Sequence, residues 1–174
     1  MRKLAFLTTA AALAAVATPA LAAPVTGTVN VSGSVAAKCK FVTASADLPL
    51  GELADADGGL DASKVDGQTR TLNGWCNNSA ATLSVKATAL TGDQAVTSGA
   101  ETAFTDRVNY TASVAANAQT FTDSSTDDLA STATTVNMFS GDIVVTLGAS
   151  TASSKKLVAG AYSGKVEVTL SPTV

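Results

Sequence analysis

Histidine is absent from this chain of 174 residues, and aromatic and charged residues are scarce. Without an imidazole there is no Ser–His or Cys–His pair, no histidine-ligated metal and no histidine general base. Aromatic residues make up 5% of the chain and charged residues 14%, so a core must be built mainly from Val, Leu, Ile and Ala. We therefore expect no enzymatic activity, no cofactor and no metal site.

Long apolar runs are also absent after the first residues of the chain. Arg2 and Lys3 precede an apolar stretch, residues 4–16, and a small-x-small sequence ends at Ala22. This order is typical of a secretory leader, and the stretch is too short and too interrupted to be a membrane-spanning helix. We predict a signal peptide over residues 1–22, export of the rest, and no membrane insertion of the mature chain.

The remaining part, about 150 residues, suits one domain with its own hydrophobic core. The whole chain has 11 Lys+Arg against 14 Asp+Glu, for a net charge of −3. The acidic residues are dispersed and no basic patch forms, so we expect no nucleic acid partner.

The only two cysteines, Cys39 and Cys76, both lie in the part predicted to be exported. An even pair in an oxidising compartment indicates a disulfide. A catalytic thiol would lack a histidine base. We therefore predict a Cys39–Cys76 bond that stabilises the fold by about 3–4 kcal/mol through loop closure.

Apolar and polar residues alternate along most of the chain, as in half-buried strands. The first such run is Val25 to Cys39, whose odd positions are small or apolar and whose even positions are almost all polar. It is long for one strand of a compact domain. Other predicted strands cover 48–53, 68–76, 81–90, 107–115, 142–147 and 161–170. Turn-rich segments separate them, including 122–131, with at most one helical turn around 61–65. The pattern predicts an all-β sandwich.

An acidic stretch, A-D-A-D-G-G-L-D, places Asp55, Asp57 and Asp61 close together. The spacing does not fit a twelve-residue calcium loop, which needs Gly at its sixth position and Glu at its last. We interpret the stretch as a solvated turn.

The two ends of the predicted mature chain carry a family resemblance. The start reads A-P-V-T-G-T-V-N-V-S-G-S-V-A-A-K-C and the end reads L-V-A-G-A-Y-S-G-K-V-E-V-T-L-S-P. Together with the cysteine pair, they resemble pilins of the chaperone–usher pathway, most closely the archaic branch that includes spore-coat-U-like proteins. The resemblance is vague between about residues 44 and 140.

The resemblance implies an immunoglobulin-like sandwich, residues 36–174, that lacks its last strand and is completed by an N-terminal extension, residues 23–35, of the next subunit. The implied donor-strand residues are Val25, Gly27, Val29, Val31 and Gly33. The implied residues at the edge of the acceptor groove are Tyr162, Val166, Val168 and Leu170. The implied partners are copies of the chain, a periplasmic chaperone and an outer-membrane usher. The implied destination is a surface pilus that supports adhesion or biofilm formation.

A second interpretation is that residues 25–34 form the first strand of a complete sandwich. The protein would then be a monomeric exported binding module, such as a surface or glycan-binding adhesin. The two interpretations differ in whether the N-terminal run stays free for a neighbour or folds onto its own domain.

Overall fold

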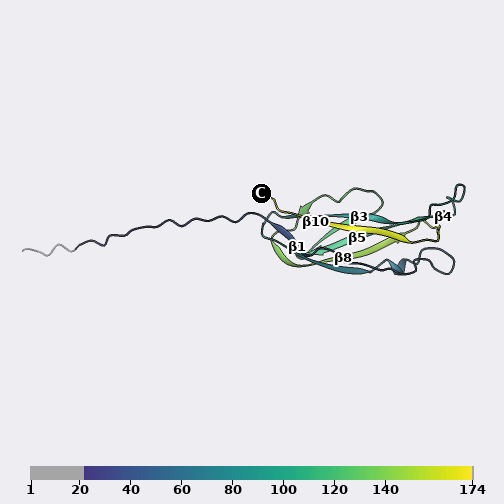
Figure 1. Ribbon diagram of the computed structural model, residues 1–174, viewed down its shortest axis with the longest axis horizontal. Helices are drawn as coiled ribbons and strands as arrows, with labels where there is room; N and C mark the ends of the chain where they lie inside the picture. The colour runs from purple at the N-terminus through teal and green to yellow at the C-terminus, as the bar shows by residue number, and fades with distance from the viewer. Residues whose placement is uncertain (1–21, 174) are drawn as a thin grey trace, which may run out of the picture. The chain divides into compact units, whose positions relative to one another are not determined.

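The computed structural model describes residues 22–173, and it divides the chain after Ser34 into two units (Figure 1). The first unit, as far as it is described, is a segment without secondary structure, residues 22–34. The second unit is the folded domain, which begins at Val35. The predicted leader lies outside the described residues, apart from Ala22.

The folded domain is built from strands, with a single 3-10 turn, η1 (Ala62–Lys64), among the described residues. The strands are β1 (Cys39–Thr43), β2 (Thr69–Cys76), β3 (Thr82–Gly92), β4 (Phe104–Thr105), β5 (Arg107–Ala116), β6 (Gln119–Ser124), β7 (Thr134–Thr135), β8 (Phe139–Thr151), β9 (Lys156–Leu157) and β10 (Tyr162–Ser171). The domain is thus all-β with an immunoglobulin-like sandwich architecture, as predicted.

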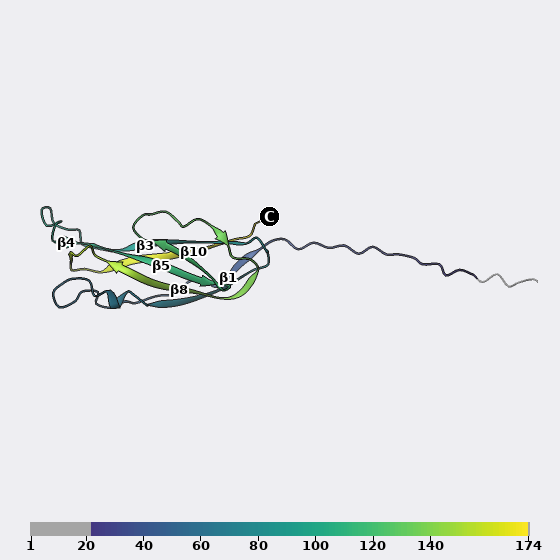
Figure 2. The ribbon, with the colours of Figure 1, turned by 180° about the vertical axis from the view of Figure 1, so that it is seen from behind.

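Strand β5 joins the two layers of the sandwich. The main sheet runs in the order β1-β2-β8-β5-β3-β10, but β3 pairs with β5 only through Leu90 and Thr91. From Thr111 onward, β6 takes the edge of β5 that β3 has left. One layer is therefore β1-β2-β8-β5-β6 and the other is β10-β3-β7. Figures 1 and 2 show β3 and β10 on one side of the domain and β8 on the other.

Alternating residues of the central strands form the core between these layers. Strand β3 buries Leu83 and Val85, β5 buries Val108 and Val114, and β8 buries Ile143. These side chains sit at every second position because successive residues of a strand point to opposite faces. Small aliphatic side chains fill most of the core, as the composition predicts.

Most of the predicted strands are confirmed. Four of them (68–76, 81–90, 107–115 and 161–170) match β2, β3, β5 and β10 within two residues at each end. The fifth, 142–147, is the centre of the longer β8. The helical turn predicted around 61–65 is η1.

Three secondary-structure predictions are wrong. The run Val25–Cys39 contributes only Cys39 to a strand, because the preceding residues pair with no strand in the described chain. Residues 48–53 form an irregular segment around Pro49, which lacks an N–H for a ladder. The segment predicted as turns from Thr122 overlaps β6, a polar strand at the sheet edge.

The predicted disulfide is confirmed. Cys39 and Cys76 face each other across the β1–β2 ladder, with Cα atoms 4.1 Å apart and an S–S distance of 2.06 Å. Such a bond is compatible with an exported protein. Within residues 22–173, no helix has the length and apolar character needed to cross a membrane.

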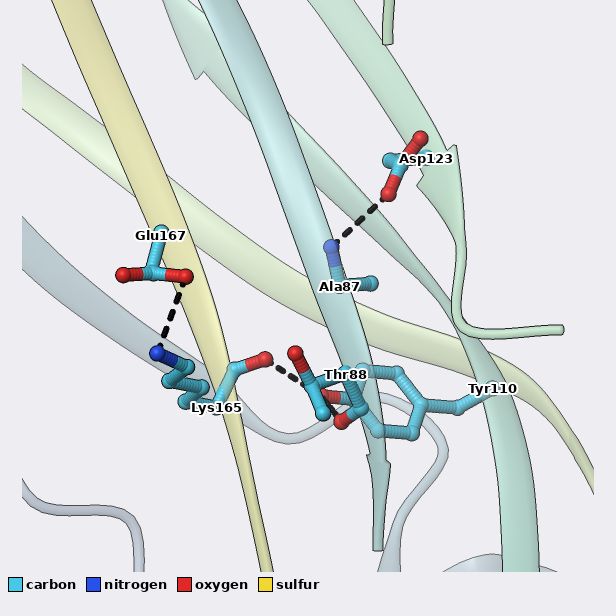
Figure 3. Close-up of polar contacts among 6 residues, drawn as sticks. All are labelled: Ala87, Thr88, Tyr110, Asp123, Lys165 and Glu167. Atoms are coloured by element: carbon cyan, nitrogen blue, oxygen red, sulfur yellow. Dashed lines mark hydrogen bonds and ion pairs between the residues drawn. The ribbon is translucent and has the colours of Figure 1, made fainter. Parts of the chain in front are cut away.

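One edge of β3 is covered along its length. Strand β7 pairs with Thr82 and Leu83, and the side chain and backbone of Ser131 bond Val85 N and O at 3.0 and 2.8 Å. Further along, Asp123 Oδ2 on β6 accepts a hydrogen bond of 2.7 Å from the N–H of Ala87 (Figure 3). These contacts close the seam between β3 and β6 with side chains where no strand fits.

Removal of the disulfide tests its part in this fold. Replacing both Cys39 and Cys76 by Ser should lower the free energy of unfolding by about 3–4 kcal/mol, because the reduced chain regains loop entropy. Urea denaturation of the variant and of the reduced wild type should give equal losses. A loss below about 1 kcal/mol in both would contradict this.

The closed seam gives a second test. Asp123→Ala leaves the buried N–H of Ala87 without its acceptor and should cost about 1–3 kcal/mol in urea unfolding. Asp123→Asn keeps an acceptor oxygen and should recover most of this loss. Asp128→Ala, in the exposed loop nearby, is the matched control and should change stability by less than about 0.5 kcal/mol. Equal effects of the two alanine variants would refute the bond's importance.

Candidate functional site

The opposite seam of the sandwich, between β1 and β10, is open. In the described chain, β1 pairs only with β2, and β10 pairs only with β3. Each strand therefore has one edge whose N–H and C=O groups enter no ladder. Such edges are templates for an added strand. This seam contrasts with the β3–β6 seam, which side chains cover.

A groove borders the open edge of β10, and we call it the seam groove. A cavity of about 390 Å³ has Leu72, Val145 and Leu147 on one layer and Gly164 and Val166 of β10 on the other. A second cavity, of about 610 Å³, shares Leu48, Leu50, Leu90 and Gly164 with the first and extends toward Tyr162. Together the two cavities border the first half of β10, from Tyr162 to Val166.

Strand β10 carries the four residues that the family resemblance implied for the groove edge, of which Tyr162 and Val166 line the two cavities and Val168 and Leu170 do not. Tyr162, Val166, Val168 and Leu170 all pack against the core, yet each stays partly exposed. The residues that β10 pairs with on β3 include Leu83 and Val85, which are fully buried. The apolar face of β10 is therefore only partly covered by its own domain.

The groove becomes shallow toward the end of β10. A methyl group placed on Gly74 of β2 would come within 3.4 Å of Leu170 Cδ1 and of Ile143 Cδ1. Leu170 thus reaches across to the opposite layer at this end. The wider space lies nearer Gly164.

The opposite wall of the groove was missed by sequence reasoning. It is formed by Leu48 and Leu50, both partly buried, in an irregular segment that Arg70 holds through a 2.6 Å bond from Nε to Asp47 O. The available signal was the L-P-L-G sequence, in which Leu flanks a Pro, but we interpreted it as a strand. Leu72 of β2 completes the wall.

The five residues predicted to form a donor strand lie in the exposed N-terminal segment, where apolar or glycine residues alternate with polar ones. Val25, Val29 and Val31 are 98%, 86% and 91% exposed, and no atom lies within 4 Å of where a Cβ would stand on Gly27 or Gly33. In an extended chain these odd-numbered residues share one face. The segment thus presents an apolar face that its own unit does not bury.

Tyr110 fixes the path of β10 at the groove. Its hydroxyl lies 2.8 Å from Thr88 O and 3.0 Å from Lys165 O, so its proton is shared between carbonyls of β3 and β10 (Figure 3). A β-bulge lies here, between Ser163 and Lys165. A Cβ on Gly164 would approach Thr88 O to 2.8 Å, which only glycine avoids. Burial raises the pKa of Tyr110 to about 12.

The acidic stretch forms a turn, as interpreted from the sequence. Asp55 Oδ1 accepts bonds of 2.9 and 2.8 Å from the N–H groups of Asp57 and Gly59. Asp61 caps η1 by accepting from Ser63 N and Oγ, and the hydroxyl bond lowers the pKa of Asp61. In the part of the chain that the structure covers, no three Cys, Asp or Glu side chains are grouped to hold a metal ion.

Comparison with known proteins does not assign the chain to a family. No protein-family model matches the chain, and no curated protein matches it.

The bond network of Tyr110 predicts a pH dependence. In the unfolded chain this tyrosine ionises near the usual tyrosine pKa of 10.0, while in the folded domain it stays protonated up to about 12. Between about pH 10 and pH 12 the folded state therefore binds this proton more strongly than the unfolded state does. The free energy of unfolding falls as the pH rises through this window. Tyr110→Phe lacks this loss but also lacks the hydroxyl proton that the two carbonyls share, and that hydrogen bond contributes about 0.5–1.5 kcal/mol.

Urea unfolding of wild type and Tyr110→Phe should therefore show a stability gap at pH 8 that narrows by pH 11. A constant gap over this range would contradict the assignment. Tyr162→Phe is the matched comparison, since burial also raises the pKa of Tyr162, which bonds Val158 O and Thr105 O instead.

Proposed function

We propose that this protein is a structural subunit of a surface pilus and that it polymerises by donor-strand exchange. In this proposal, residues 25–34 of one copy fill the seam groove of the next copy. The observation that carries the proposal is the presence, in one chain, of a groove beside the unpaired edge of β10 and of a segment of alternating apolar residues that lies outside any strand.

The lengths of the two parts support the proposal. Strand β10 has 10 residues, and residues 25–34 form a segment of the same length. At about 3.3 Å per residue, one extended segment spans the whole edge of β10. A strand added there would bond to the free edge of β10, each main-chain bond contributing about 0.5–1.5 kcal/mol.

The side chains also match the shape of the groove. Val29 and Val31 are small and β-branched, which suits the space between Leu72 and Val166, and burying each valine contributes about 1.5–3 kcal/mol. Gly27 and Gly33 carry no side chain and allow close backbone approach where the groove is shallow, as it is beside Leu170.

The open seam also supports the proposed assembly partners. Before polymerisation, the exposed edges and the partly covered face of β10 are an aggregation risk. A periplasmic chaperone that occupies the groove would remove this risk, and an outer-membrane usher would then exchange it for the next subunit. The assembled pilus would lie at the cell surface and support adhesion or biofilm formation.

Gel electrophoresis in SDS of protein sheared from the cell surface tests the proposal. Wild type should give a ladder of multimers in unheated samples that collapses to monomer on boiling. Deletion of residues 25–34 should abolish the ladder. So should the pair Val29→Asp and Val31→Asp, because two charges would enter the apolar groove.

The matched control is the pair Thr28→Asp and Asn30→Asp, which adds the same charge to the other face of the segment and should keep the ladder. A lone monomer band from wild type in every condition would overturn the fibre. It would favour the alternative from the sequence, a monomeric exported binding module that folds the segment onto itself.

A further inference from the structure

Asn77 holds the residues that connect the N-terminal segment to β1. It follows Cys76 directly, and its backbone N–H donates to Lys38 O at 3.0 Å. Its side chain adds two bonds, with Oδ1 accepting from Lys38 N at 2.7 Å and Nδ2 donating to Ala36 O at 3.0 Å. Residues 36–38 are therefore bound alongside the end of β2, next to the disulfide. The backbone bond forms with any residue at this position, so we call the two side-chain bonds the Asn77 clamp.

We infer that Asn77 is a positioning residue that keeps the chain from filling its own seam groove and so reserves the groove for a second copy. This inference rests on the proposed function, since it concerns which copy supplies the added strand. A chain can supply its own added strand only if it is able to reverse direction close to β1. The position of that turn therefore decides whether the strand comes from the same copy or from a second copy.

Self-insertion requires a hairpin before β1, because the segment must turn back along the free edge of that strand. Without the clamp, the tightest hairpin is a two-residue turn at Ala37 and Lys38, which places Ala36 opposite Cys39. Counting back along the pair, Ser32 then lies opposite Thr43, the last residue of β1, so residues 25–31 extend beyond β1 toward Leu48 and Leu50. The segment would reach the wall of the groove.

With the clamp in place, Ala36 and Lys38 are bound to Asn77 and are unable to form that turn. The nearest two-residue turn is Ser34 and Val35, which places Gly33 opposite Ala36. Val31 then lies opposite Lys38, before β1, and Thr26 lies opposite Thr43, so almost the whole segment is used up alongside β1. Such a hairpin leaves the space beside Leu48 and Leu50 empty. A second copy has no such tether and reaches the whole groove.

The test uses freshly refolded, monomeric mature chain in three forms: wild type, Asn77→Ala and Asn78→Ala. Asn78 is the matched control, because it is the adjacent asparagine and bonds Ala80 N and Thr173 O instead of the connecting residues. The probe is a fluorescent synthetic peptide with the sequence of residues 25–34. Its uptake is followed by anisotropy, and backbone amide exchange of β10 is measured without peptide.

Wild type and Asn78→Ala should take up the peptide equally. Asn77→Ala should take up at least fivefold less, and its β10 amides should exchange more slowly than those of wild type, because its own segment covers the edge. Asn77→Asp keeps the acceptor for Lys38 N and loses the donor to Ala36 O. It should show an intermediate effect, and it replaces the alanine variant if that variant does not fold.

Two results would overturn the inference, and they are distinguishable. If the folded Asn77 variants take up peptide as wild type does, with unchanged β10 exchange, the clamp does not select the copy, while the proposed function stands. If wild type takes up no peptide, the groove does not accept this segment, and the proposed function fails together with the inference.

Discussion

Backbone groups at the edge of a sheet need hydrogen-bond partners, and this requirement organises the whole domain. At the β3–β6 seam, Asp123 and Ser131 supply those partners from side chains. At the β1–β10 seam no strand or side-chain cover of that kind is found in the described residues. Within the described residues, the domain therefore has one seam whose strand edges are covered and one whose strand edges are left unpaired. The groove, the free segment and the clamp are all arranged around this difference.

Because the core residues are small, the apolar side chains at the open seam matter for the stability of the domain. A core of Ala and Val brings modest apolar area per residue, since each buried methylene contributes about 0.8 kcal/mol. Val166, Val168 and Leu170 of β10, together with Leu48 and Leu50, are among the aliphatic side chains that the domain covers only in part. Covering them therefore adds substantially to the stability of the domain. The disulfide supplements the same small core by restricting the unfolded chain.

Alternation in the sequence predicted most of the strands, because a half-buried strand leaves a period of two. It failed for residues 25–38 for a physical reason: alternation reports an apolar face but not whether a partner strand exists in the same chain. Strand β6 was missed because its Thr and Asp residues are polar at a sheet edge. The cysteine pair and the β10 face were predictable. The groove wall at Leu48 and Leu50 and the role of Asn77 were not, since both arise from contacts between distant segments.

The position of the disulfide also determines how the domain would carry mechanical load. In a fibre of the kind proposed, tension arriving along residues 25–38 enters the domain at Cys39. There the covalent bond passes it directly to Cys76, so β1 is unable to peel away from β2 one hydrogen bond at a time. The force is carried onward by the eight residue pairs between β2 and β8, loaded together in shear. The junction between β1 and β2 would thus not be the place where a subunit gives way under tension.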